Sequence, residues 1–219
     1  MNNILIDVDG NQYKTVEIGD QIWMAENLKV RHFRNGEPIL ISKDRMRCGR
    51  HINSKESAVY ISEEDKSEYI KYGLLYTPKI MFDDRCVAPM GWHIPTLSEW
   101  EKLVMFLGGR DVAGRKLKNE HGWKREYNQP STYSYYKRCE FGGTNDFGFS
   151  ALPSGKMVTL YENAFDVGMY AWYWAADQQK VSETTNWYGY FNLNYYKGNV
   201  ELGCTAINSY LAIRCVKDL

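Results

Sequence analysis

The chain has 219 residues, of which 44% are hydrophobic and 25% are charged, a composition that favours one large globular domain. Lysine plus arginine equal aspartate plus glutamate at 27 each, so no net charge would attract nucleic acid or an anionic membrane surface. No apolar run is long enough to span a bilayer, and the first residues lack the regions of a signal peptide. These features argue against a nucleic-acid-binding protein and against a membrane span in this chain.

The aromatic content is the unusual feature, with 17 Tyr, 7 Trp and 8 Phe. Aromatic side chains are enriched where a surface binds something, because they give a large contact area at low entropic cost. They also favour β-strands and strand-rich cores. We therefore expect aromatic residues on both faces of the same strands, one face in the core and the other available to a ligand.

The N-terminal region predicts a β-hairpin. Two alternating segments, Ile4–Val8 and Tyr13–Ile18, are separated by the turn residues Asp9, Gly10 and Asn11. An Asp-Gly pair between alternating segments is a strong hairpin signal. A second turn at Gly19-Asp20 leads into a third extended segment, residues 21–28.

The middle of the chain predicts a short amphipathic helix. Thr96 follows Pro95 and precedes Glu99 by three residues, which is the spacing of a capping box. The apolar residues that follow recur at helical spacing, and the helix should end at Gly108-Gly109. They are Leu97, Trp100, Leu103, Val104 and Leu107.

The last third of the chain reads as short strands and turns. We expect strands at 170–177, 186–194 and 210–216, with a turn at 197–199. Alternation assigns the faces of the second of these strands, with Phe191 and Leu193 in the core. The residues that should then point outward are Tyr188, Tyr190, Asn192 and Asn194.

The cysteine pattern does not suggest a zinc site, because the five cysteines are widely spaced without Cys-x-x-Cys. They are Cys48, Cys86, Cys139, Cys204 and Cys215. In an exported protein, Cys86 and Cys215 are the first candidates for a disulfide, and we expect them to be neighbours whether bridged or not. In a reducing compartment all five would be small buried hydrophobic residues.

The order of several motifs resembles the Fibrobacter succinogenes major paralogous domain, a family of surface-type modules common in Bacteroidetes. The resemblance covers most of the chain. It rests on 9–29, which contains Trp-Met-Ala-Glu-Asn-Leu-Lys, on 35–39, 86–109 and 114–118, on Gly-Thr-Asn-x-x-Gly-Phe-Ser-Ala-Leu-Pro-Ser-Gly at 143–155, and on Ile-Arg-Cys-Val-Lys-Asp at 213–218.

This resemblance implies a single domain over 1–219 with a C-type-lectin-like α+β fold, mixed or antiparallel sheets and one or two short helices. The two chain ends should meet in one sheet, and long irregular loops should carry the ligand. Residues 42–76 depart from the family pattern, and their charged runs predict a solvated helical or loop insertion. Residues 156–219 are the candidate variable region.

No motif for catalysis or metal binding is evident, so we expect neither an enzyme nor a cofactor. The four histidines, His32, His51, His93 and His121, have no metal-ligand spacing. His93, in the turn before the helix, suits a structural role. The calcium- and sugar-binding signature of C-type lectins is missing, and the nearest segment, 128–131, ends in Ser131 rather than a carboxylate. An enzyme on the related formylglycine-generating fold is the alternative.

We expect a ligand-binding module for a protein or glycan, exposed outside the cell, on the cell surface or on a virion. Its binding face should be rich in aromatic residues and Asn. An architectural surface or virion component is a further alternative. The candidate ligand-binding residues are Tyr170, Trp172, Tyr173, Asp177, Trp187, Tyr188, Tyr190, Asn192, Asn194, Tyr196, Asn208 and Tyr210.

The composition of the supposed outward positions also resembles that of C-type-lectin-like proteins diversified by retroelements. Such proteins change exposed residues on a fixed scaffold, here with Trp174 and Arg214 as framework. We therefore include a variable receptor-binding protein of a gut bacterium or its phage among the hypotheses. The positions concerned are Tyr188, Tyr190, Asn192, Asn194, Asn208, Ser209 and Tyr210.

Overall fold

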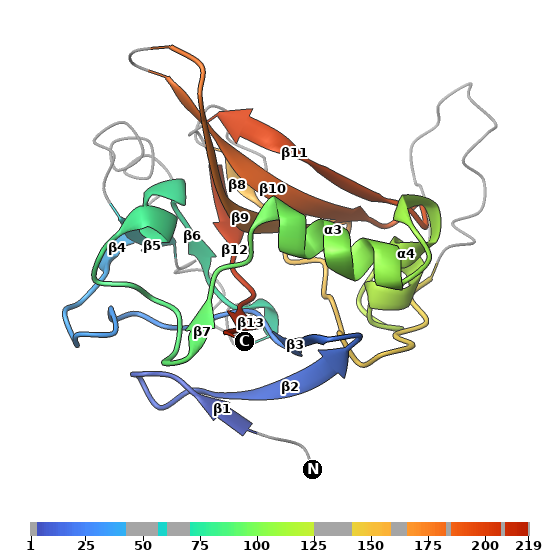
Figure 1. Cartoon of the computed structure of the whole chain (residues 1–219), viewed down its shortest axis with the longest axis horizontal. Coiled ribbons are helices and arrows are strands. Elements are labelled where there is room, and N and C mark those ends of the chain that lie inside the picture. Colours follow the sequence, from blue (N-terminus) through green and yellow to red (C-terminus); the bar gives the residue numbers. More distant parts are fainter. Residues whose placement is uncertain are drawn as a thin grey trace.

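The protein is α+β, with two sheets and two α-helices in the part of the chain that is described (Figure 1). The structure is a computed structural model that describes residues 4–42, 57–60, 71–124, 142–158, 166–182, 185–206 and 209–218. No helix within these ranges is both long enough and apolar enough to cross a membrane.

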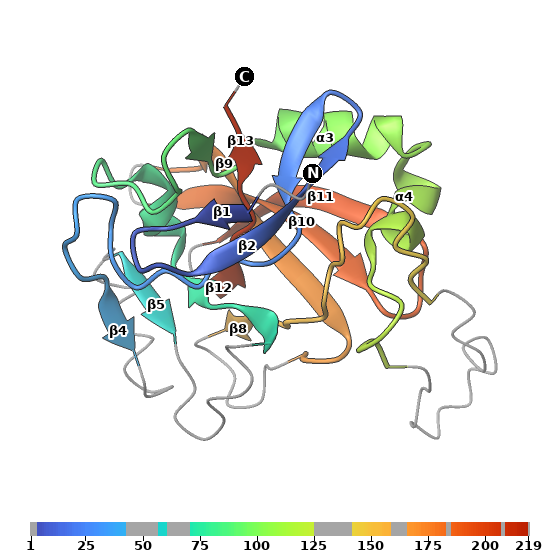
Figure 2. The same ribbon diagram turned by 90° about the horizontal axis from the view of Figure 1, so that it is seen from below.

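The smaller sheet joins the two ends of the chain, as the sequence predicts. Its five strands pair antiparallel throughout, and Val216 pairs with both Trp23 and His93. The last strand pairs with the third strand rather than the first, and Figure 2 shows the C-terminal end of the chain near the N-terminal strands. The strand order is β1 (Ile4–Ile6), β2 (Gln12–Ile18), β3 (Gln21–Met24), β13 (Val216–Lys217) and β7 (Trp92–His93).

The larger sheet has eight strands and is mixed. The β9–β12 and β4–β5 pairs are parallel, and the other pairs are antiparallel. The main path runs β11 (Val200–Ala206), β10 (Asn186–Asn194), β9 (Tyr170–Lys180), β12 (Ser209–Ala212), β6 (Leu75–Tyr76), β5 (Ala58–Tyr60) and β4 (Leu40–Ser42), and β8 (Met157–Val158) pairs with β12.

The predicted helix is confirmed as α3 (Leu97–Phe106), and its capping box is formed. Thr96 Oγ1 accepts from the Glu99 backbone N–H at 3.3 Å, and the Glu99 carboxylate accepts from the Thr96 N–H at 2.8 Å. Two donors at the helix start are therefore satisfied locally. A second helix, α4 (Arg110–Leu117), follows, and a short 3₁₀ helix, η1 (Pro78–Phe82), lies between β6 and β7.

Helix α4 packs closely on the turn after β10 because Gly114 has no side chain. A Cβ at this position would lie 2.6 Å from the Gly198 carbonyl oxygen and 2.5 Å from that of Asn199. The Arg115 N–H donates to the Gly198 carbonyl at 3.1 Å. The glycine therefore sets how closely the helix approaches the sheet.

The β9–β10 pair has a hydrophobic core on each face. On one face Trp100 of α3 stacks on Phe191, with ring centroids 4.2 Å apart and planes 5° apart. On the other face Trp174 and Tyr188 belong to a second core, and the Trp174 Nε1–H donates to the Tyr76 carbonyl at 2.7 Å. Both Phe191 and Trp174 are fully buried, as expected.

One expectation for the larger sheet is wrong. Residues 210–216 do not form one strand, because the chain leaves β12 after Ala212 and enters the smaller sheet as β13. Most of the charged segments that suggested an insertion at 42–76 lie outside the described residues, and the described parts of this range include β5 and β6. Ala58, Leu74 and Tyr76 are almost completely buried there.

Candidate functional site

Four of the expected binding residues form a continuous row of rings, which we call the aromatic strip: Tyr170, Trp172, Tyr190 and Tyr196. Their side chains are half-buried. The ring centroids of Trp172 and Tyr190 are 5.1 Å apart, and the Tyr170 ring lies 6.1 Å from Trp172 and 6.5 Å from Tyr196. Tyr170 and Trp172 lie on β9, Tyr190 lies on the neighbouring strand β10, and Tyr196 lies just after β10.

A lysine covers the centre of the aromatic strip. Lys156 Nζ lies 3.7 Å from the Trp172 ring centroid, a cation–π geometry. Burial lowers the pKa of Lys156, and the Asp166 carboxylate partly opposes that shift. Beside it is a hollow of about 120 Å³ whose lining includes Lys156, Trp172, Tyr190 and Cys204. This hollow is too small to enclose a drug-sized ligand, since such pockets measure about 300–1,000 Å³.

Five other expected binding residues are buried, and the outward orientation expected for four of them, all except Tyr173, is wrong. Alternation places Tyr188, Tyr190, Asn192 and Asn194 opposite Phe191, but the second core covers most of that face. Tyr188 packs on Phe82 of η1, and the Asn192 Nδ2–H donates to the Ala171 carbonyl. The buried residues are Tyr173, Tyr188, Asn192, Asn194 and Tyr210.

The remaining expected residues do not join the aromatic strip. Asp177 makes a structural contact, because its Oδ2 accepts a hydrogen bond from the Leu97 N–H at 2.5 Å, at the start of α3. Trp187 is 42% exposed and takes part in no ring contact with the strip. Asn208 lies outside the described residues.

Cys86 and Cys215 belong to the same hydrophobic cluster, and both are free thiols. Burial raises the pKa of the Cys215 thiol, and the neighbouring Cys86 raises it further. The two cysteines are therefore neighbours, as expected, but the structure shows no bridge between them. Cys48 and Cys139 lie outside the described residues.

His93 has a structural environment. Its Nδ1 lies 2.5 Å from Asp218 Oδ1 and its Nε2 lies 2.6 Å from Glu99 Oε1, so the ring joins the last strand to the capping box of α3. Partial burial lowers the pKa of His93, but hydrogen bonds to Asp218 and Glu99 outweigh this effect and raise the pKa overall. Within the described ranges no group of three or more acidic, His or Cys side chains could hold a metal ion.

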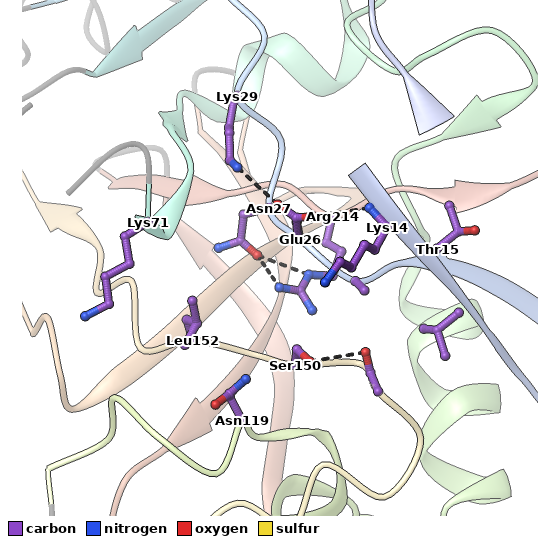
Figure 3. A pocket seen from close by; sticks show the side chains of 13 residues that line it. Lys14, Thr15, Glu26, Asn27, Lys29, Lys71, Asn119, Ser150, Leu152 and Arg214 are labelled. Atoms are coloured by element: carbon purple, nitrogen blue, oxygen red, sulfur yellow. Dashed lines mark hydrogen bonds and ion pairs between the residues drawn. The ribbon is translucent and has the colours of Figure 1, made fainter. Parts of the chain in front are cut away.

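Sequence reasoning missed a cavity of about 410 Å³ on the side of the smaller sheet (Figure 3). Its lining carries four basic side chains and one acidic side chain. These are Lys14, Lys29, Lys71, Arg214 and Glu26. No local pattern marks this site, because its residues come from segments far apart in the chain.

Arg214 forms the buried part of this cavity. Its Nε and Nη2 donate to Asn27 Oδ1 at 3.1 and 2.7 Å, and its Nη1 donates to the Phe149 carbonyl. The guanidinium carbon lies 4.4 Å from the Phe149 ring centroid and 5.3 Å from that of Tyr173. Both acceptors of these three hydrogen bonds are neutral, so no carboxylate pairs directly with this guanidinium within the described ranges.

The motif 143–155 supplies the opposite wall of the cavity. The Asn145 side chain accepts from the Ser150 N–H at 2.7 Å and donates to Ser150 Oγ at 2.9 Å. Both residues have positive φ, which asparagine tolerates better than most residues. This arrangement places Ser150 and Leu152 on the cavity, facing Asn27 and Arg214.

Three of the segments behind the sequence resemblance thus meet at one cavity. A family model described as the Fibrobacter succinogenes major domain matches residues 16–217, nearly the whole chain. The chain belongs to this family. No curated protein and no solved structure matches it.

Within this Fibrobacter succinogenes major domain, the aromatic strip and the cavity are separate. Their linings share no residue. The strip lies on the large sheet, whereas the cavity is walled by β2, by the loop after β3 and by the 148–152 segment. The domain therefore has two independent candidate sites.

Proposed function

We propose that this domain is a non-enzymatic module that binds a protein ligand through the aromatic strip. The observation that carries the proposal is the unbroken row of half-buried rings from Tyr196 to Tyr190, with a lysine above its centre. Protein interfaces are enriched in Tyr and Trp, which supply rigid contact area.

The position of Lys156 favours a protein over a glycan. A sugar ring stacks on an open aromatic face, but Lys156 Nζ already lies 3.7 Å from the Trp172 ring centroid. The hollow beside it could receive one side chain of a partner. A charged group over an aromatic anchor is suited to a protein surface that offers a carboxylate next to an apolar residue.

We also propose that the α+β fold is C-type-lectin-like. A C-type-lectin-like arrangement is supported by the way β13 lies between β3 and β7, which brings the two chain ends into one sheet. The long connections without regular structure, such as 142–156, are in keeping with it. A location on a cell surface or virion follows from the family resemblance alone.

The burial pattern does not favour retroelement diversification of these positions. Of the seven positions considered, Tyr188, Asn192, Asn194, Ser209 and Tyr210 are buried, and substitutions there would disturb packing. Tyr190 is half-buried. A near-copy of the coding sequence beside a reverse transcriptase gene, differing only at adenines, would support diversification, and a complete locus without one would refute it.

The binding proposal can be tested with two unbiased probes, a displayed random-peptide library and a glycan array, applied to the immobilised domain. We expect enrichment of peptides and no glycan signal that depends on the strip. Trp172→Ala and Tyr190→Ala should each weaken peptide binding by about 2 kcal/mol, as interface anchors do. Met105→Ala is the matched control, because Met105 is 64% exposed on α3, away from the strip.

Two results would contradict the proposal. One is peptide binding that survives both strip substitutions. The other is a glycan that binds the parent domain and is lost with Trp172→Ala, which would assign the strip to sugar recognition instead.

A further inference from the structure

The cavity at Arg214 concentrates positive charge that the described protein does not neutralise. Its lining holds four basic side chains, Lys14, Lys29, Lys71 and Arg214, against the single carboxylate of Glu26. That carboxylate is already engaged, since Glu26 Oε2 pairs with Lys29 Nζ at 3.1 Å and Oε1 accepts from the Lys14 N–H. Figure 3 shows these side chains around one opening.

Arg214 is the most unusual of these groups, because a fully buried guanidinium normally has a carboxylate partner. Here its hydrogen-bond partners are the Asn27 amide and the Phe149 carbonyl, both neutral. Three of its five N–H donors are used in these bonds. Burial accordingly lowers the pKa of Arg214. An anion in the cavity would compensate this charge.

The two remaining lysines lie at the rim. Lys14 and Lys71 are exposed and line the cavity. Within the described ranges neither ammonium group forms an ion pair, and Lys71 Nζ rests 4.7 Å from the Tyr72 ring centroid. Such groups can turn toward an incoming anion at little cost.

The rest of the lining is suited to hydroxyl groups. Asn119 and Ser150 present polar side chains, and Val16 and Leu152 add an apolar surface. A volume of about 410 Å³ falls within the range of small-molecule sites. The lining thus combines an anion-binding centre with hydrogen-bonding groups and an apolar wall, the features that a sugar acid would use.

We propose that this cavity binds an acidic sugar, with its carboxylate or sulfate held by Arg214, Lys14 and Lys71 and its hydroxyls by Asn119 and Ser150. The site differs from the aromatic strip in place and in ligand. It does not depend on the function proposed for the strip.

Calorimetric titration of the intact domain with four probes tests the proposal. The probes are glucuronate, glucose 6-sulfate, methyl glucoside as the neutral sugar, and inorganic sulfate. We expect glucuronate or glucose 6-sulfate to bind, and the stronger of the two identifies carboxylate or sulfate as the natural anion. The neutral sugar should not bind, inorganic sulfate should bind more weakly, and added salt should reduce affinity.

Substitutions of the exposed lysines test ligand binding without disturbing the structural contacts of Arg214. Lys14→Gln and Lys71→Gln change exposed residues, so the fold should persist, and each should lower the affinity about tenfold, the size expected for a hydrogen bond to a charged group. Glu26→Gln should raise the affinity, because it removes the one negative charge of the lining. Lys180→Gln, at an exposed position outside the lining, should change nothing.

The outcomes are distinguishable from those for the strip. Trp172→Ala should leave binding of the sugar acid unchanged, so either proposal can fail alone. Three results would overturn the cavity proposal: no binding of either acidic sugar, equal affinity for inorganic sulfate and the sugar acids, or affinities insensitive to Lys14→Gln and Lys71→Gln.

Discussion

Asn27 and Arg214, which are 187 residues apart in the chain, are joined by two hydrogen bonds from one guanidinium to one amide oxygen. This contact connects the loop after β3 to the segment between β12 and β13. Since Arg214 also donates to the Phe149 carbonyl, three distant segments are joined at a single side chain. The same contact shapes the wall of the cationic cavity.

Removing the Asn27 side chain should destabilise the fold, because the buried Arg214 guanidinium loses a hydrogen-bond acceptor. We expect Asn27→Ala to reduce the free energy of unfolding by about 1.5–3 kcal/mol, the size expected when a hydrogen bond to a buried charged group is lost. Chemical denaturation measures this. Asn35→Ala is the control, because Asn35 Oδ1 accepts only from the Glu37 N–H in an exposed turn. Equal small losses in both variants would show that the Arg214 contacts contribute little to stability.

Much of the fold could be predicted because its signals are local. The hairpin follows from alternation around Asp9 and Gly10, and helix α3 follows from Thr96, Glu99 and the apolar spacing. The break between β12 and β13 could not be predicted, because residues 210–216 alternate like a single strand. Arg214 lies in this break and contacts Asn27 and Phe149, and no local pattern reveals these contacts.

The candidate site was harder to predict for a related reason. Alternation correctly separates Phe191 from Tyr190, but it does not tell which face meets solvent when cores lie on both sides of the sheet. Asn192 looks like a surface residue in the sequence, yet its amide bonds the Ala171 carbonyl inside the protein. The cavity escaped prediction because its charges come from separate segments.

The two neighbouring rings on β10 should respond differently to truncation. Phe191→Ala should cost about 3–5 kcal/mol of stability, because the buried ring stacks on Trp100 at 4.2 Å. Tyr190→Ala should cost clearly less, since its ring is half-buried. Denaturation of the two variants compares them, and equal large losses would mean that Tyr190 is a core residue rather than part of a binding surface.

The capping box of α3 makes a smaller and separable contribution. Thr96→Ala should lower stability by about 1 kcal/mol, because the Glu99 N–H loses its side-chain acceptor. Thr96→Ser, which keeps the hydroxyl, should restore most of that loss. If Ser and Ala behave alike in urea denaturation, the hydroxyl does not stabilise the helix.

His93 should make the stability depend on pH. Its pKa is raised by Asp218 and Glu99, so the protonated ring stabilises the fold below about pH 6.5, the ordinary value of histidine, and this contribution is lost as the pH rises through the folded-state pKa. The melting temperature of the parent should therefore exceed that of His93→Gln most at about pH 6 and least at about pH 9. Parallel curves for the two proteins across this range would exclude the linkage.

The binding proposal is tested most directly by mapping the ligand on the domain with amide chemical shifts. Titration with the tightest peptide from the displayed library should shift signals of residues 170–173 on β9 and 188–192 on β10, which carry most of the aromatic strip. Shifts confined to α3 or to the N-terminal hairpin would contradict the proposal that the strip is the protein-binding surface.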